Sequence, residues 1–147
     1  MTVDWSKYRH LSKEMNWTQP HKMDVEFLTI LDEFCIFIGF PIILTSTYRE
    51  GDSKTHGRGI AADIMAGIEK DISLLDLYLL AEKFGKFRGV GMYPHWQKDV
   101  NSRGSKPEGG LHLDIRTDDQ ARWIAIMQKE KQVYIALNEH NIKEYIL

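Results

Sequence analysis

The sequence contains one cysteine, no long apolar run and little excess of charge of either sign. Because Cys35 stands alone, the chain cannot form an internal disulfide, and its apolar surroundings predict a buried, inert thiol. The longest apolar run, from Phe34 to Leu44, is interrupted by Gly39 and Pro41. A membrane helix needs about 20 consecutive apolar residues, so we expect no membrane insertion.

Charge and length set further limits on the function. The chain has 19 basic and 21 acidic residues, which argues against a nucleic-acid partner because such domains carry a basic stripe. The N-terminus lacks the basic and apolar regions of a secretory signal, so we expect synthesis in the cytoplasm. With 147 residues, the chain fits one domain that spans residues 1–147, and we expect a monomer.

The most informative stretch is SKTHGRGIAADIM, from Ser53 to Met65. It begins with a glycine-containing loop that carries His56, since glycine permits backbone conformations closed to other residues. Alternation of apolar side chains then predicts a strand, in which Asp63 points away from the face of Ile60 and Ile64. An imidazole and a carboxylate are thus placed where a loop enters a strand.

A second strand pattern, GLHLDIR, occupies Gly110 to Arg116. Its leucines and isoleucine share one face, while His112, Asp114 and Arg116 share the other. Two histidines and an aspartate form a ligand set that suits zinc, and three protein ligands with water in the fourth position are typical of a catalytic site. A single histidine would more often be a surface or core residue, so the joint pattern carries the prediction.

Taken together, the motifs His-x-x-Gly-x-Ala-x-Asp and His-x-Asp resemble a family of zinc metallopeptidases. This family includes D-alanyl-D-alanine carboxypeptidases and dipeptidases and phage L-alanyl-D-glutamate endopeptidases, and the Hedgehog signalling domain shares its fold. Three further stretches within residues 20–127 look like family features: Thr45 to Arg49, Gly89 to Pro94, and Asp114-Ile115-Arg116 followed by Ala121-Arg122-Trp123.

The resemblance implies an α+β fold with a small, mainly antiparallel sheet of about four strands, helices on one face and a zinc cleft on the other. It implies one Zn²⁺ per chain, held by His56, Asp63 and His112. Arg49 at a strand end would bind a substrate carboxylate or the developing oxyanion, because its planar donors form paired hydrogen bonds. The alternative for Arg49 is a solvated surface side chain.

The resemblance also implies a substrate class, the peptide stem of bacterial peptidoglycan. The sequence does not choose between cleavage at L-Ala-D-Glu and at a D-Ala linkage, because the contacts that decide specificity lie in loops. A phage lysis enzyme of this type is made in the cytoplasm and acts on the cell wall, so another protein would have to carry it across the inner membrane.

The general base is where the sequence departs from the family. Many members place a carboxylate or histidine two or three residues before the last ligand, where this chain has Gly109 and Gly110. Three candidates remain, namely Glu108, Asp114 and His95. We predict that Glu108 is the base and that Asp114 orients the neighbouring ligand, with the reverse assignment left open.

Apolar periodicity and turn residues predict the other elements. Helices are expected from Thr18-Gln19-Pro20 to Gly39, from a cap at Ser73 to Gly85, and from near Thr117, with residues 130–147 either continuing that helix or forming a docking segment. Further strands are expected at Ile42–Thr47 and Arg88–Tyr93, and the polar loop over 94–110 is expected to form a wall of the cleft.

Two other function classes stay open. The chain could be a binding or structural protein of the same fold that holds zinc without turnover, or an unrelated metal-dependent hydrolase with the same ligand pattern. Zinc content does not distinguish the zinc-holding binding protein from a peptidase. Release of peptides from purified cell wall distinguishes them.

Overall fold

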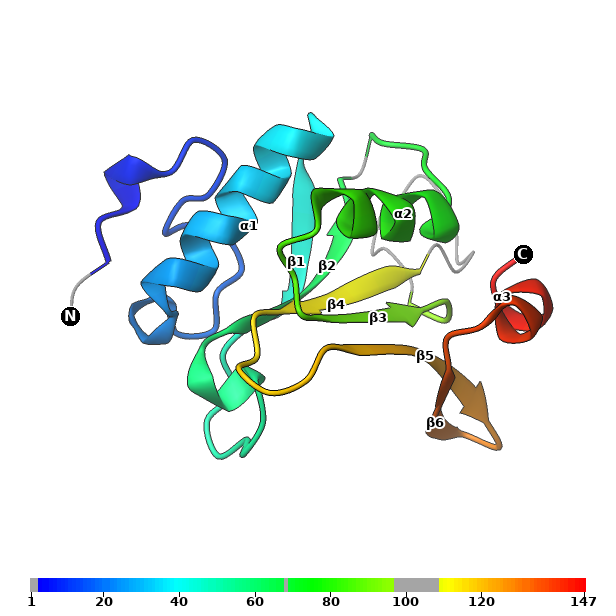
Figure 1. Ribbon diagram of the computed structural model, residues 1–147. Coiled ribbons are helices and arrows are strands. Elements are labelled where there is room, and N and C mark those ends of the chain that lie inside the picture. The colour runs from blue at the N-terminus through cyan, green and yellow to red at the C-terminus, as the bar shows by residue number, and fades with distance from the viewer. Residues whose placement is uncertain (1–2, 68, 97–108) are drawn as a thin grey trace.

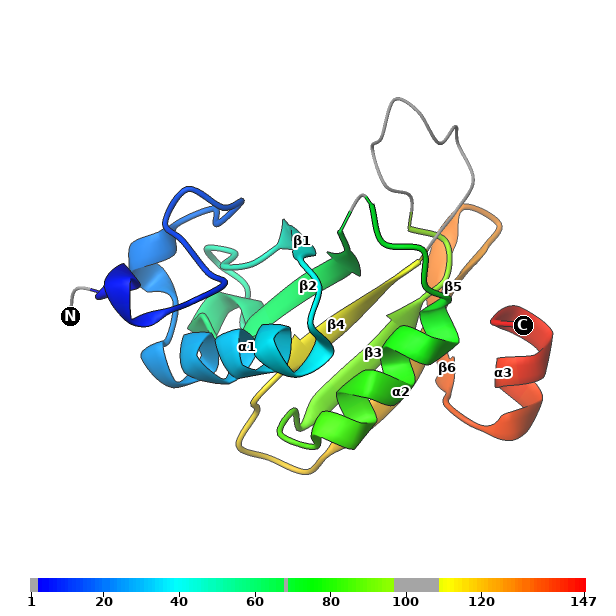
Figure 2. The same ribbon diagram turned by 90° about the horizontal axis from the view of Figure 1, so that it is seen from above.

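A sheet with helices packed on one face organises the chain (Figures 1 and 2), as seen in a computed structural model that describes residues 3–67, 69–96 and 109–147. The α-helices are α1 (Val25–Ile38), α2 (Leu74–Phe84) and α3 (Glu139–Tyr145), and the short 3-10 helices are η1 (Trp5–Lys7), η2 (Pro20–Lys22) and η3 (His56–Arg58). The strands are β1 (Ile42–Ser46), β2 (Ala61–Ala66), β3 (Gly89–Tyr93), β4 (Gly110–Asp114), β5 (Ala121–Gln128) and β6 (Lys131–Ala136).

The sheet has six strands in the order β1-β2-β4-β3-β5-β6. Among these described strands, only β3 and β5 pair in parallel, and the other neighbours are antiparallel. The predicted α+β class is therefore confirmed, whereas the expected number of about four strands is too small. The four strands predicted from the sequence are β1 to β4, which lie side by side in the sheet and carry both ligand motifs.

The predicted helix from Thr117 is wrong, because this segment forms β5 and then β6. Ala121, Ile124 and Met127 fit a helical spacing, yet Met127 is 47% exposed while Ile124 is fully buried. The side chains alternate instead, with Ile124 and Ile126 both turned into the core. Lys129 and Glu130 have φ values of 49° and 65° and link the two strands in a tight turn.

Helix α1 begins later than the sequence predicts. Pro20 starts the short helix η2, and α1 begins at Val25, where the Asp24 carboxylate accepts a hydrogen bond from the Phe27 backbone N–H at 2.9 Å. The helix ends at Gly39, with φ of 77°, as predicted. The predicted cap and stop of α2, Ser73 and Gly85, are also confirmed.

The core lies between the sheet and the helices α1 and α2. It includes the fully buried rings of Phe27, Phe34 and Phe87 packed against side chains of β2 and β4. Cys35 is buried here, and its burial raises the pKa of the thiol to about 12, as expected for an inert cysteine. No helix in the described ranges is long and apolar enough to span a membrane.

The N-terminal segment, whose role the sequence does not predict, lies beside α1 (Figure 1). The buried Asp32 of α1 accepts hydrogen bonds from the backbone N–H groups of Arg9 and His10 at 3.1 and 2.8 Å. Leu11 and Trp17 are buried in the same core. The segment is thus part of the domain rather than a free arm.

Candidate metal centre

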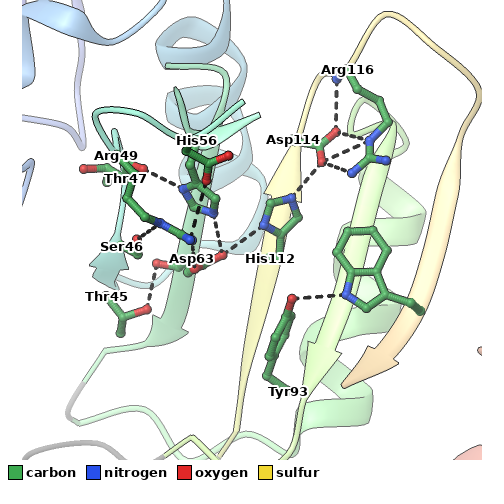
Figure 3. A network of polar contacts seen from close by, with 12 residues as sticks. Thr45, Ser46, Thr47, Arg49, His56, Asp63, Tyr93, His112, Asp114 and Arg116 are labelled. Atoms are coloured by element: carbon green, nitrogen blue, oxygen red, sulfur yellow. Dashed lines mark hydrogen bonds and ion pairs between the residues drawn. The ribbon is translucent and has the colours of Figure 1, made fainter. Parts of the chain in front are cut away.

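Three side chains from separate elements meet on the face of the sheet opposite α1 and α2 (Figure 3). They are His56 of η3, Asp63 of β2 and His112 of β4, which are 4%, 6% and 5% exposed. One ligand atom from each lies within 4.8 Å of the other two. Asp63 and His112 are direct register partners in the β2–β4 pair, so their side chains leave the sheet on the same face.

His56 lies in the loop before β2, and one of its ring nitrogens forms a hydrogen bond to the backbone. Its Nδ1 lies 2.6 Å from the Thr47 carbonyl oxygen, which can only accept, so Nδ1 carries the proton. The other nitrogen, Nε2, then holds a lone pair. It lies 3.3 Å from Asp63 Oδ1 and is buried without a hydrogen-bond partner among the described residues.

Close backbone approach in this loop explains one of its glycines. A Cβ atom at position 57 would lie 1.7 Å from the Asp52 carbonyl oxygen, so any side chain there would force the loop apart. Gly59 adopts a φ of 71° at the end of η3, a conformation that favours glycine. The two glycines that separate the ligands in sequence therefore shape the turn that aims His56.

His112 is oriented by a buried carboxylate. Its Nε2 lies 2.7 Å from Asp114 Oδ2 and its Nδ1 lies 3.0 Å from Asp63 Oδ1. Arg116 holds Asp114 in place, donating from Nε to Oδ1 at 2.9 Å and from Nη2 to Oδ2 at 2.6 Å. A proton on Nε2 leaves the Nδ1 lone pair facing Asp63, which is the arrangement of a metal-ligating histidine and its carboxylate partner.

The charges of the group respond to burial and to each other. Burial raises the pKa of the Asp63 carboxyl, but its interactions with the imidazoles of His112 and His56 outweigh burial and leave the pKa below its usual value. Burial lowers the pKa of His112, but hydrogen bonds to Asp114 and Asp63 leave it raised. Burial also acts against ionised Asp114, yet His112 and Arg116 hold the pKa of that carboxyl well below its usual range.

These residues fit a divalent metal ion. Metal bonds of about 2.0–2.1 Å in a tetrahedral site put ligand atoms roughly 3.3 Å apart. Asp63 Oδ1 lies 3.0 Å from His112 Nδ1 and 3.3 Å from His56 Nε2. Both nitrogens that face Asp63 are the ones left without a proton by their other partners, so a cation would satisfy the buried His56 Nε2.

A cleft of about 720 Å³ opens over the group. Its lining includes three cationic side chains near the β1 end, Arg49, Lys54 and Arg58, and three aromatic ones, Tyr93, Trp123 and Tyr134. Arg49 is half-exposed and lies at the expected place: its Nη2 is 3.5 Å from Asp63 Oδ2 and its Nη1 is 3.6 Å from Asp52.

The three candidates for the base differ in placement. Asp114 is completely buried, and His112 and Arg116 occupy its oxygens, which suits the predicted orienting role. Glu108 lies outside the described residues. His95 is half-buried, with its ring 6.2 Å from that of Tyr93, and it is not among the described residues that line the cleft.

Tyr93 and Trp123 are among the residues of the cleft wall that were not predicted from the sequence. The Trp123 indole N–H donates to the Tyr93 hydroxyl at 3.2 Å (Figure 3). The signal was present in the sequence as Gly89 and Gly91, two positions of β3 that carry no side chain and lie at alternate residues before Tyr93. A Cβ atom at position 91 would lie 2.4 Å from Trp123 Nε1, and one at position 89 would lie 2.2 Å from Asp114 Oδ2.

The arrangement can hold one cation between two imidazoles and a carboxylate, beneath a cleft open to solvent. A set of three protein ligands leaves a coordination position for water or substrate, whereas structural zinc sites usually have four protein ligands.

Comparison of the chain with family models, curated proteins and solved structures gives no match.

Proposed function

We propose that the protein is a zinc-dependent peptidase that hydrolyses amide bonds in the peptide stem of bacterial peptidoglycan. One observation carries the proposal. Three atoms with lone pairs lie around a common position under the cleft, namely His56 Nε2, Asp63 Oδ1 and His112 Nδ1. The resemblance of the two ligand motifs to the carboxypeptidase and endopeptidase family supports the substrate class.

When bound, zinc would polarise the scissile carbonyl and lower the pKa of a bound water to about 7. The residues of the chain then have separate tasks. His56, Asp63 and His112 hold the ion, and Asp114 orients His112. Arg49 binds a substrate carboxylate or the developing oxyanion, and Glu108 is the predicted proton acceptor. The amide is hydrolysed without a covalent intermediate on the protein.

The charge of the cleft supports an anionic substrate. Lys54 and Arg58 line it beside Arg49, and neither side chain forms a hydrogen bond or ion pair with any residue in the described ranges. As far as the described residues go, these two cations are therefore available to a ligand. Peptidoglycan stems carry carboxylates, so the charge of Lys54 and Arg58 matches the chemistry of the proposed substrate.

The test is incubation of the zinc-loaded protein with purified peptidoglycan, followed by mass spectrometry of the released peptides. New amino termini at D-Glu would identify an endopeptidase, and loss of D-Ala a D-Ala-linkage peptidase. His112→Ala serves as the inactive control, because it removes a ligand and should remove most of the zinc. No release by a fully zinc-loaded protein would refute the proposal.

One observation favours a second candidate, a zinc-holding binding protein without turnover. The two positions directly before Leu111 are Gly109 and Gly110, which offer no carboxylate or imidazole to accept a proton. Such a protein would bind zinc and stem peptides and leave the peptides intact. Peptide binding without cleavage in the same incubation identifies this function.

A further inference from the structure

Tyr93 and Trp123 form a hydrogen-bonded pair on the wall of the cleft, next to His112 (Figure 3). Gly91 and Trp123 are register partners in the parallel β3–β5 pair, so the indole lies over a position that lacks a side chain. The ring centroids of Trp123 and His112 are 5.1 Å apart, and the Arg116 guanidinium lies 5.4 Å from the indole centroid. These contacts hold Trp123 beside the metal group.

The phenol of Tyr93 is held just as firmly. Its ring stacks on Trp96, with a centroid distance of 4.2 Å and an interplanar angle of 16°, and the residue is 7% exposed. Its hydroxyl oxygen accepts the Trp123 N–H at 3.2 Å, and its side chain lines the cleft. The hydroxyl is therefore fixed in position at the edge of the space that a substrate would occupy.

The contact with Trp123 does not use the proton of this hydroxyl. A phenol oxygen that accepts from an indole keeps its own O–H for another partner. Burial raises the pKa of Tyr93 well above its ordinary value. The Trp123 hydrogen bond lowers it, whereas the charge of Asp63 and the interaction with Tyr134 raise it further. The group thus stays protonated at neutral pH and can donate a hydrogen bond without ionising.

We infer that the Tyr93 hydroxyl is a catalytic hydrogen-bond donor to the carbonyl oxygen of the scissile amide, and that Trp123 is the residue that positions it. The inference rests on the proposed peptidase function. The carbonyl oxygen gains negative charge as the amide is attacked, so a donor placed in advance stabilises the transition state more than the bound substrate. No covalent bond to Tyr93 forms, and its proton is not transferred.

Tyr93→Phe tests the donor because it removes only the oxygen. We expect kcat for stem-peptide hydrolysis to fall about 10²-fold, as when an oxyanion donor is lost, while KM and zinc content stay unchanged. Tyr8→Phe is the matched control, since Tyr8 packs on Trp5 in the N-terminal segment. An unchanged kcat in Tyr93→Phe overturns the inference.

A second measurement separates failure of the inference from failure of the proposed function. A phosphinate analogue of an L-Ala-D-Glu dipeptide carries tetrahedral oxygens, and its affinity for the zinc-loaded protein can be measured by calorimetry without turnover. We expect about tenfold weaker binding to Tyr93→Phe than to the wild type. Equal affinities refute the donor role, as does a wild type that does not bind the analogue. Absence of hydrolysis together with the expected loss of affinity refutes only the peptidase.

The role of Trp123 is tested by a double-mutant cycle. If Trp123 acts through the Tyr93 hydroxyl, Trp123→Phe lowers kcat in the wild type and has no further effect in Tyr93→Phe. Additive losses would show that Trp123 acts by another route and would remove the positioning role. Thermal unfolding of each variant shows whether a loss of kcat reflects a loss of fold instead.

Discussion

Asp114 Oδ2 lies 2.7 Å from His112 Nε2 and thereby turns the opposite ring nitrogen toward Asp63. The two residues are neighbours on the same face of β4, and Arg116 fixes the carboxylate from the other side. Asp114, which is not one of the three possible ligands, thus decides which nitrogen of His112 could bind a metal ion. This relationship makes the metal site sensitive to changes outside its ligands.

Asp114→Asn should weaken metal binding. The amide cannot carry the charge that holds Arg116 and His112, and loss of such a partner costs about 10 to 100-fold in metal affinity or activity. Competition with a chelator of known affinity measures the change. Asp119→Asn alters an exposed carboxylate on the loop after β4 and should keep the wild-type affinity. Equal affinities in the two variants would contradict the orienting role.

Gly89→Ala should produce a similar loss from the neighbouring strand. The new Cβ would lie 2.2 Å from Asp114 Oδ2, so the carboxylate must move away from His112. The control is Gly39→Ala at the end of α1, where φ is 77° and no atom lies within 4 Å of the new Cβ. That variant should lose about 1 kcal/mol of stability and keep its metal affinity. A Gly89→Ala protein with wild-type affinity would disprove the steric explanation.

Metal affinity should fall as the pH falls, because protons compete for the ligands. Burial lowers the pKa of His112, but hydrogen bonds to Asp114 and Asp63 leave it above 6.5, so the competition begins above that pH. Calorimetry in buffers of different ionisation enthalpy counts the protons that zinc releases. A zinc affinity that stays constant as the pH falls would contradict competition by protons at His112.

The same pKa shifts predict how the stability of the metal-free protein depends on pH. The raised pKa of His112 stabilises the fold fully below pH 6.5, and this contribution is lost as the pH rises through the raised pKa. The lowered pKa of Asp63 stabilises the fold above pH 3.8, and this contribution is lost as the pH falls through the lowered value. Urea unfolding of the chelator-treated protein across this range should show a maximum in the free energy of unfolding. His112→Gln should remove the decline on the alkaline side.

Arg49→Lys tests the role of the guanidinium beside Asp63. The lysine keeps the charge but cannot form two parallel hydrogen bonds to a carboxylate, so turnover should fall while fold and zinc content survive. Steady-state kinetics with a stem peptide and metal analysis of the same sample measure both. Arg9→Lys, on the N-terminal segment, is the control. Wild-type turnover in Arg49→Lys would show that Arg49 is a solvated surface side chain without a role in turnover.

Glu108→Gln tests the predicted base, which lies outside the described residues. Loss of a general base typically costs about 10² to 10⁴-fold, so we expect at least a hundredfold lower turnover with zinc still bound. Asp114→Asn should differ from Glu108→Gln, because its main effect should be a loss of bound metal. Near wild-type turnover of Glu108→Gln at saturating zinc would show that another group accepts the proton.

The sequence by itself determined the four strands β1 to β4, the part of the sheet that bears the candidate ligands. Alternation around Asp63 and His112 is a local property of a strand, so their common orientation follows from residue order alone. The C-terminal end of α1 and both ends of α2 could also be predicted. Gly39 and Gly85 end the helices by their backbone conformation, and Ser73 caps α2 with its side chain. The ligand set needed only these local rules and the motif spacing.

Only the tertiary structure decided the remaining two strands, β5 and β6. The spacing of Ala121, Ile124 and Met127 is compatible with a helix, and parallel pairing with β3 makes this segment a strand instead. The contact of Trp123 with Tyr93 depends on that pairing and on the missing side chain at Gly91. Backbone hydrogen bonds to a distant strand outweigh a local propensity, and no property of the segment itself records which partner it will meet.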